Sequence, residues 1–399
     1  MIGYSNLNGL YYDLGDFEKS DFITKIAFDY TKKNFPENSQ EYFMASLSVA
    51  EVKIQRRDFE EAIYYLDNAS TSLEKIVGDN FQLKAFLYNE YANIYHLTNE
   101  FDKALEYREL SDLNYSKSNP NAYDSNKLYN TMNLALAYSK FGDKEKAINT
   151  VQDAYDYFYK TKGEKDYFTN ALMLTFAKVY FNLKMYKESL MWTNKSLIIY
   201  SKNDSDKTID KVYFEEDKAE IYIINAQSKF HLSETKDSIF LKDILSDVDN
   251  AIKAIEEKKI SINSFKDIST LIEDNTTVFD FAKKINLELY DLTNNTSYLD
   301  KTISLHESAL YNRIRARLNT KPNISFSNIP KHIADRENEL RALQNNKEAN
   351  FELLMLNNDT WHNFLDTLKT AYPKYYKMRY ATIEKPLDSI YKKIPKNTT

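Results

Sequence analysis

The stretch Leu134-Ala135-x-x-Tyr138-x-x-Phe141-Gly142-Asp143, with a small residue, Ala, four positions later, decides the fold because it recurs along the chain. That small residue stands at positions 20, 62, 104, 147 and 189, so the spacings are 42, 42, 43 and 42 residues. A second small residue follows each of them after seven positions. Internal repeats with periods of about 20 to 50 residues are typical of stacked arrays. The sequence therefore predicts five clear repeats instead of two or three ordinary globular domains.

Each repeat has the features of a helix, a tight turn and a second helix. The small residues allow the two helices to approach closely, while the Tyr and Phe positions fill the space between neighbouring hairpins. Gly15 and Gly142 suit the left-handed backbone that ends a first helix, and Asn99 tolerates it. Arg57 and Lys184 stand at the same position, where they would carry a small strain cost.

Acidic residues stand where each second helix is expected to begin. Asp16, Asp58 and Asp143 occupy the N-cap position, where a side-chain oxygen can accept a hydrogen bond from a free N–H group. Asp58 followed by Glu61 also matches a capping box. We therefore expect each second helix to start directly after these residues.

The repeat resembles the tetratricopeptide repeat, whose usual period is about 34 residues. The resemblance implies an all-α solenoid, a right-handed superhelix of helix pairs with a concave groove. The longer period implies longer helices or longer links. Beyond residue 200 the pattern weakens, and the degenerate pairs expected there are a helix from about Ala219 to His231 with a partner that contains Asp249 and Ala254, then residues 278–293 and 298–318.

The last hundred residues resemble a more particular arrangement. After residues 287–307 come Ile329-Pro330, an amphipathic run through Trp361 and Leu368, the segment Tyr372-Pro373-x-Tyr375-Tyr376, and a short helix expected from about Lys385 to Ile394. This order is similar to the region that joins tetratricopeptide repeats to the caspase-like CHAT domain in bacterial proteins. The resemblance implies that the repeats act as a sensor or scaffold and that the CHAT domain is a protease with a His and Cys dyad.

The sequence departs from that family where its chemistry would lie. It contains no cysteine, so it supplies no thiol nucleophile and no catalytic residue is carried over. A CHAT domain would follow residue 399, and we therefore expect the chain to be a piece of a longer protein. The expected organisation is residues 1–318 as helical repeats and residues 319–399 as a C-terminal helical linker or cap.

Composition argues against several other functions. All six glycines lie at or before Gly163, so the remaining residues lack the glycines of a phosphate-binding loop. No metal or cofactor site is expected, because the histidines are scattered without metal-binding spacing: His96, His231, His306, His332 and His362. No signal peptide or membrane-spanning stretch is recognisable, so a cytoplasmic location is expected.

The two parts of the chain differ in charge. Residues 1–299 hold 36 basic and 48 acidic side chains, a net charge of −12, whereas residues 300–399 hold 17 and 11, a net charge of +6. The negative repeats disfavour a nucleic-acid partner. The basic end is either a solvated surface or a docking site for an acidic partner. The segment from Tyr372 to Tyr380 interleaves aromatic and basic residues, as single-stranded nucleic-acid binders can. Because the joining region of the resembled family has a similar Pro and Tyr-Tyr pattern, the resemblance favours packing or a turn.

The concave groove is the candidate binding site, because the first helices of stacked pairs share one surface. The register places nine residues there: Tyr12, Glu51, Ile54, Asn93, His96, Leu97, Ser139, Lys178 and Phe181. Their mixture of aromatic, apolar and hydrogen-bonding groups is typical of a surface that binds an extended peptide. The Lys and Asn pairs with which some tetratricopeptide proteins hold a C-terminal carboxylate are missing at the equivalent positions. The alternative is an exposed inner surface, or one that contacts the C-terminal helices.

The sequence thus predicts a non-enzymatic scaffold or sensor that binds a peptide or protein in the groove. The alternative is a regulatory fragment of a CHAT-type protease, whose catalytic domain would be a partner in the same or another chain.

Overall fold

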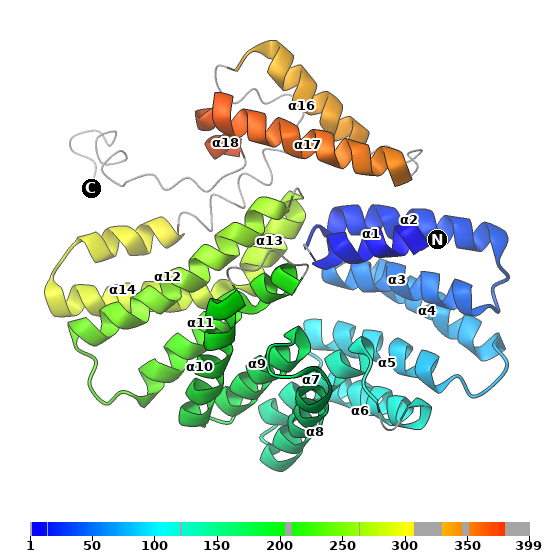
Figure 1. Ribbon diagram of the computed structural model, residues 1–399, viewed down its shortest axis with the longest axis horizontal. Helices are drawn as coiled ribbons and strands as arrows, with labels where there is room; N and C mark the ends of the chain where they lie inside the picture. Colours follow the sequence, from blue (N-terminus) through cyan, green and yellow to red (C-terminus); the bar gives the residue numbers. More distant parts are fainter. Residues whose placement is uncertain are drawn as a thin grey trace. The chain divides into compact units, whose positions relative to one another are not determined.

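A computed structural model describes residues 2–13, 15–119, 122–203, 210–262, 264–306, 329–344 and 351–379. Every regular element within these ranges is an α-helix, and the helices follow one another as tetratricopeptide-like hairpins (Figure 1). The predicted all-α repeat fold is therefore confirmed. Among the described helices, none combines the length and the apolar character needed to cross a membrane.

The five clear repeats form five helix pairs with short turns. Their bounds are α1 Ile2–Asp13 and α2 Phe17–Asn34, α3 Gln40–Gln55 and α4 Phe59–Lys75, α5 Phe81–Leu97 and α6 Phe101–Ser118, α7 Ser125–Lys140 and α8 Lys144–Lys162, and α9 Tyr167–Asn182 and α10 Tyr186–Asn203. Most of these helices have 16 to 19 residues, which accounts for the period of about 42.

The degenerate repeats are helical as well. Their bounds are α11 Asp210–Leu232, α12 Ser238–Ser261, α13 Phe265–Asp274 and α14 Thr276–Thr293, and residues 297–306 are also helical. The C-terminal segment contains α16 Lys331–Gln344, α17 Phe351–Ala371 and α18 Pro373–Arg379. The short helix α13 was not predicted. The boundary at residues 318 and 319 and the helix expected over residues 385–394 lie outside the described residues.

The chain divides into two compact units, which we describe separately. The repeat unit comprises Ile23–Lys236 and Ser246–Ala254. The terminal unit comprises Met1–Phe22, Asp237–Leu245 and Ile255–Thr399.

The turn between the two helices of each pair has the predicted left-handed residue. Gly15 and Gly142 have φ angles of 74° and 80°, and Asn99 has 65°. Arg57 and Lys184 adopt the same conformation, with φ angles of 61° and 60°. The repeat therefore imposes one turn geometry even where a side chain with a Cβ atom makes that geometry costly.

The small residues lie at the crossings of the paired helices, as predicted. Ala62 and Ala147 are completely buried, and Ala104 is nearly so. Where serine replaces alanine, its hydroxyl donates to the partner helix: Ser111 to the carbonyl of Ala85 at 2.8 Å and Ser189 to that of Ala177 at 2.9 Å. Close approach thus places a hydroxyl within reach of a backbone carbonyl that a bulkier residue would cover.

The N-cap prediction is confirmed at two second helices and wrong in part at a third. The Asp16 carboxylate accepts the Lys19 N–H at 3.4 Å. The Asp143 carboxylate accepts the Lys146 N–H at 3.1 Å. Asp58 stands at the N-cap of α4, but its side chain makes no capping hydrogen bond. The capping box with Glu61 is also not formed, because the Glu61 carboxylate turns to the buried ammonium of Lys53 at 2.7 Å.

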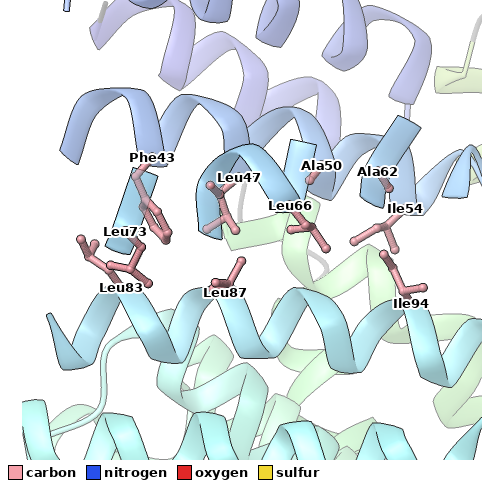
Figure 2. Close-up of a cluster of buried hydrophobic side chains, with 11 residues drawn as sticks. Phe43, Leu47, Ala50, Ile54, Ala62, Leu66, Leu73, Leu83, Leu87 and Ile94 are labelled. Carbon is pink, nitrogen blue, oxygen red and sulfur yellow. The ribbon is translucent and has the colours of Figure 1, made fainter. Parts of the chain in front are cut away.

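Apolar side chains from three consecutive helices fill the interior of the second pair and its junction with α5 (Figure 2). Leu66 and Leu73 of α4 point toward Leu83 and Leu87 of α5 (Figure 2), and Leu66 is completely buried. Each fully buried leucine contributes about 1.5 to 3 kcal/mol of hydrophobic stabilisation. The pair is thus held to its neighbour by the same kind of packing that holds its own two helices together.

In the terminal unit, residues far apart in sequence meet at the start of α2. The N–H of Glu18 donates to the carboxylate of Asp267 at 2.7 Å, and a Cβ on Gly15 would lie 3.4 Å from Ile262. The first turn of α2 therefore receives one of its acceptors from α13, 249 residues along the chain.

The C-terminal helices have their own contacts. The Tyr375 hydroxyl of α18 donates to the buried Glu337 carboxylate of α16, and Trp361 and Leu368 of α17 are buried. The aromatic residues of the Tyr-Pro-x-Tyr-Tyr segment thus take part in packing, as the first of the two sequence interpretations expects.

Candidate partner-binding surface

The first helices of the repeat unit lie against one another. Helix α3 contacts α5, α7 contacts α9, and α9 contacts α11. Polar pairs bridge equivalent positions of successive helices: Lys178 and Glu220 form an ion pair at 2.6 Å, and the Asn182 amide donates to the Ser139 hydroxyl at 2.9 Å. The side chains of α7, α9 and α11 thus form one continuous surface, and His96 of α5 lies near it, because the Phe101 ring contacts both His96 and the Lys140 ammonium of α7.

Several of the predicted residues lie on this surface. His96 is exposed, and Lys178 and Phe181 are half-buried. Asn93 is half-buried too, but its amide is engaged within α5 and α6. Leu97 packs against the apolar cluster of α3, α4 and α5 and is only partly buried.

Three other predicted residues occupy different surroundings. Ile54 is completely buried in the apolar cluster, where it lies beside Ile94 (Figure 2), so its expected place on the binding surface is wrong. Ser139 is 2% exposed and acts as an acceptor beneath the surface. Tyr12 belongs to the terminal unit, where its ring meets Phe17 edge to face at 5.4 Å.

A buried polar network lies below the exposed residues of α5. The amides of Asn89 and Asn93 donate to the Glu90 carboxylate at 2.9 and 3.0 Å. Their carbonyl oxygens accept from the Arg108 guanidinium at 2.9 and 2.7 Å. The two amides thus join a buried carboxylate to a buried guanidinium, and each has its orientation fixed by both partners.

Burial governs the ionisation of this network. Burial raises the pKa of the Glu90 carboxyl, while the hydrogen bonds from Asn93 and Asn89 and the charge of Arg108 oppose that change. Burial lowers the pKa of Arg108 to about 10, and the Glu90 charge acts in the other direction. Arg108 remains charged at neutral pH. The network therefore engages the side chains of both Asn89 and Asn93 within the helix pair.

Positive groups surround the exposed imidazole of His96. Desolvation by neighbouring atoms and then the charges of Lys140, Arg108, Lys178 and Arg57 lower the pKa of His96 to about 4. Burial and then the charge of Lys178 lower the pKa of Lys140 as well. His96 is therefore neutral at pH 7, and its ring can donate or accept a hydrogen bond there.

Aromatic rings accompany these cations. Phe101, which is 43% exposed, lies edge to face with His96 at 5.6 Å, and the Lys140 ammonium lies 5.7 Å from the same ring. Further along, Phe181 contacts Tyr186 at 5.4 Å and His231 at 6.1 Å. The surface therefore combines rigidly held aromatic edges with positive charge.

Sequence reasoning missed Lys140 and Phe101, although a signal was present. Lys140 stands 43 residues after Leu97, which is the spacing between these two repeats, so the two residues are equivalent. Because the register placed Leu97 on the surface, it also predicts Lys140 there. Phe101 is the first residue of α6, and the Phe positions were expected to fill the space between neighbouring hairpins. Among the described residues, no group of three or more His, Asp or Glu side chains could hold a metal ion.

No family model matches the sequence, and no curated protein matches it. Among solved structures, BtubC (BKLC) from P. vanneervenii is 15% identical; the match covers 60% of this chain and 90% of that one, with a TM-score of 0.47. A Rap protein complexed with competence and sporulation factor is 13% identical over 95% of both chains, with a TM-score of 0.46. A tetratricopeptide repeat protein from Parabacteroides merdae ATCC 43184 is 14% identical over 76% of this chain and 99% of that one, with a TM-score of 0.38. These likenesses assign no partner or activity to this chain.

Proposed function

We propose that the chain is a non-enzymatic protein-interaction scaffold that binds an extended peptide or protein segment along the first helices of the repeat unit. The observation that carries this proposal is the surface around His96. An exposed imidazole and an exposed Phe101 ring lie on the packed helices α5 and α6, and the half-buried Phe181 lies on α9, which packs against α7 and α11. Side chains on rigid helices are ordered before a partner arrives, which lowers the entropic cost of binding.

Aromatic groups are expected to provide most of the binding energy. A few buried aromatic contacts usually dominate an interface, and polar groups around them set specificity. His96 and Phe181 belong to equivalent repeat positions on α5 and α9, so a segment that crosses the first helices can contact both. The hydrogen bond from Asn182 of α9 to Ser139 of α7 holds these two first helices together.

The test is a pull-down that identifies a bound protein, followed by titration of that protein against two double variants. We expect His96→Ala with Phe181→Ala to weaken binding at least tenfold, which is about 1.4 kcal/mol, while helical content is unchanged. Glu106→Ala with Glu145→Ala, both at exposed second-helix positions, is the matched control and should change binding by less than about 0.5 kcal/mol. If the control pair weakens binding and the surface pair does not, the proposed site is wrong.

A narrower role is a sensor or scaffold for a CHAT-type caspase-like protease domain, present in the same or another chain. What supports it is the order of elements after the repeats, where α16, α17 and α18 follow with Tyr375 joined to Glu337. Because this chain has no cysteine, any dyad thiol would come from that domain. Co-purification of this chain with a CHAT domain, and a change in the peptidase rate of that domain on addition of this chain, would support the role. The absence of both effects would exclude it.

A further inference from the structure

Two lysines and a neutral histidine of α5, α7 and α9 lie near one another, and this group has chemistry that the proposed function leaves open. The inference rests on that function and names the class of segment that the surface takes. The members of this group are His96 of α5, Lys140, which is the last residue of α7, and Lys178 of α9.

The charges of the two lysines are incompletely neutralised by the carboxylates of the described residues. Lys140 is exposed, and no described carboxylate lies within ion-pair distance of its ammonium. Lys178 is paired with Glu220 at 2.6 Å, and Glu220 is the described carboxylate whose charge also reaches Lys140. One carboxylate therefore serves two lysines, and the charges that act on the neighbouring His96 are all positive.

The position of this group is unusual for the chain. Residues 1–299 carry a net charge of −12, so the surroundings of a positive patch repel acidic partners everywhere except at the patch. The charge of Lys178 lowers the pKa of Lys140, and the charges of both lysines help to lower the pKa of His96, so these groups disfavour one another's charged forms. An incoming carboxylate would relieve that repulsion.

We propose that Lys140, Lys178 and His96 bind acidic side chains of an extended peptide in which the acids recur every third residue. The two lysines supply ammonium donors, and the neutral imidazole supplies an N–H donor. The Phe101 ring, which contacts both His96 and Lys140, excludes water from one side of the bound carboxylate.

The spacing follows from helix packing. Helices in contact, such as α7 and α9, have axes about 8 to 10 Å apart, and an extended peptide advances about 3.3 Å per residue. Three residues of the peptide therefore span the step from one first helix to the next. The proposal concerns acidic side chains of an internal segment, because the three donor groups, His96, Lys140 and Lys178, are distributed over three helices and do not converge on one point.

The experiment measures binding of fluorescein-labelled nine-residue peptides to the full chain by anisotropy. All are made of Ser with three Glu or three Gln, and the first three are blocked at the C-terminus by amidation. One places Glu at every third position, one places the three Glu together, one replaces Glu by Gln, and a fourth is the Gln peptide with a free C-terminal carboxylate. The matched protein variants are Lys140→Gln with Lys178→Gln, and Lys144→Gln with Lys187→Gln at exposed sites of α8 and α10.

We expect the spaced Glu peptide to bind the unmodified chain at least tenfold more tightly than either the clustered or the Gln peptide. Lys140→Gln with Lys178→Gln should remove that preference, while Lys144→Gln with Lys187→Gln keeps it within twofold. Added salt should weaken binding of the spaced peptide, because exposed charges are screened. Since Lys178 pairs with Glu220, Lys140→Gln alone is included as a variant that keeps this ion pair.

Equal binding of the Glu and Gln peptides, absence of binding of the spaced peptide, or an unchanged preference in the lysine variants would each overturn the inference. Preference for the free-carboxylate Gln peptide would also overturn it in favour of a terminal carboxylate. If the Gln and Glu peptides bind equally, yet binding is lost on His96→Ala with Phe181→Ala, the acidic preference fails while the peptide-binding function stands.

Discussion

Leu66 and Arg108 occupy the same position in neighbouring helix pairs, 42 residues apart, and both are buried. Leu66 lies within a cluster of apolar side chains, whereas Arg108 lies 5% exposed in a network of asparagine amides and a glutamate. Both pairs nevertheless have the same left-handed turn and the same buried small residue, Ala62 or Ala104. The difference teaches that the turn and the small residue determine how the two helices pair, while the interior can be apolar or polar provided that its polar groups are satisfied.

A second position shows the same tolerance. Tyr95 and Tyr138 each lie beneath a lysine eight residues later, with Lys103 and Lys146 at 4.9 Å from the ring centroids. In the second pair the equivalent residue is Lys53, and the residue eight positions later, Glu61, forms an ion pair with it. The cation has moved from the second helix to the first, and the contact between the helices persists.

The largest expected effect removes the charge on which the polar interior depends. We expect Arg108→Leu, which copies Leu66, to destabilise the chain by about 3 to 5 kcal/mol, because Glu90 remains buried without its cation. The free energy of unfolding from denaturant titration measures this. Leu66→Met is the control and should cost less than about 1.5 kcal/mol.

The double variant Glu90→Gln with Arg108→Leu sharpens the same comparison. It should lose less than Arg108→Leu alone, because no carboxylate is left without a counter-charge. Losses that simply add would show that the two charges act independently.

A smaller effect should be equal in both interiors. Leucine at the small-residue position overpacks the crossing and is expected to cost about 1 to 3 kcal/mol at each of three sites, Ala62, Ala104 and Ala147. Denaturant midpoints of the three variants would measure the cost. An unchanged midpoint for Ala147→Leu would contradict the register, and a much larger loss in one pair would show that the interior, too, determines the crossing.

The features that determine how two helices pair could be predicted from the sequence, whereas the polar contents of their interior could not. The turns and small residues were predicted because a left-handed φ angle and a close crossing each restrict the residue type locally. The network of Glu90 and Arg108 was not, because it depends on which side chains of two helices face each other. Ile54 shows the limit most clearly: it shares a repeat position with His96, yet Ile94 packs beside it and leaves it fully buried.

The cations of the candidate surface were predicted only in part for a similar reason. Lys178 was placed by the register, but Lys140 acquires its role from the proximity of Lys178 and Phe101 on other helices. Helix α13 was missed because it carries neither the glycine turn nor the small residue of the repeat.

The smallest expected effect concerns the turns. Lys184 is exposed and has a φ angle of 60°, so Lys184→Gly should stabilise the chain by about 0.5 to 1 kcal/mol once the greater freedom of glycine in the unfolded chain is subtracted. Asn99→Gly should change stability by less than about 0.5 kcal/mol, because asparagine tolerates this conformation. Thermal unfolding of both variants provides the measurement, and a loss of stability in Lys184→Gly would show that its side chain contributes a contact that outweighs the strain.

The hydrogen bond from the Glu18 N–H to the Asp267 carboxylate also affects when the start of α2 can be completed during synthesis. Ribosomes add about 5 to 20 residues per second, so the 249 residues between donor and acceptor take about 10 to 50 s to synthesise. During that interval the start of α2 lacks its acceptor, and the Gly15 turn lacks the Ile262 side chain that later packs on it. The start of α2 is therefore completed only after the helices between Glu18 and Asp267 have been synthesised.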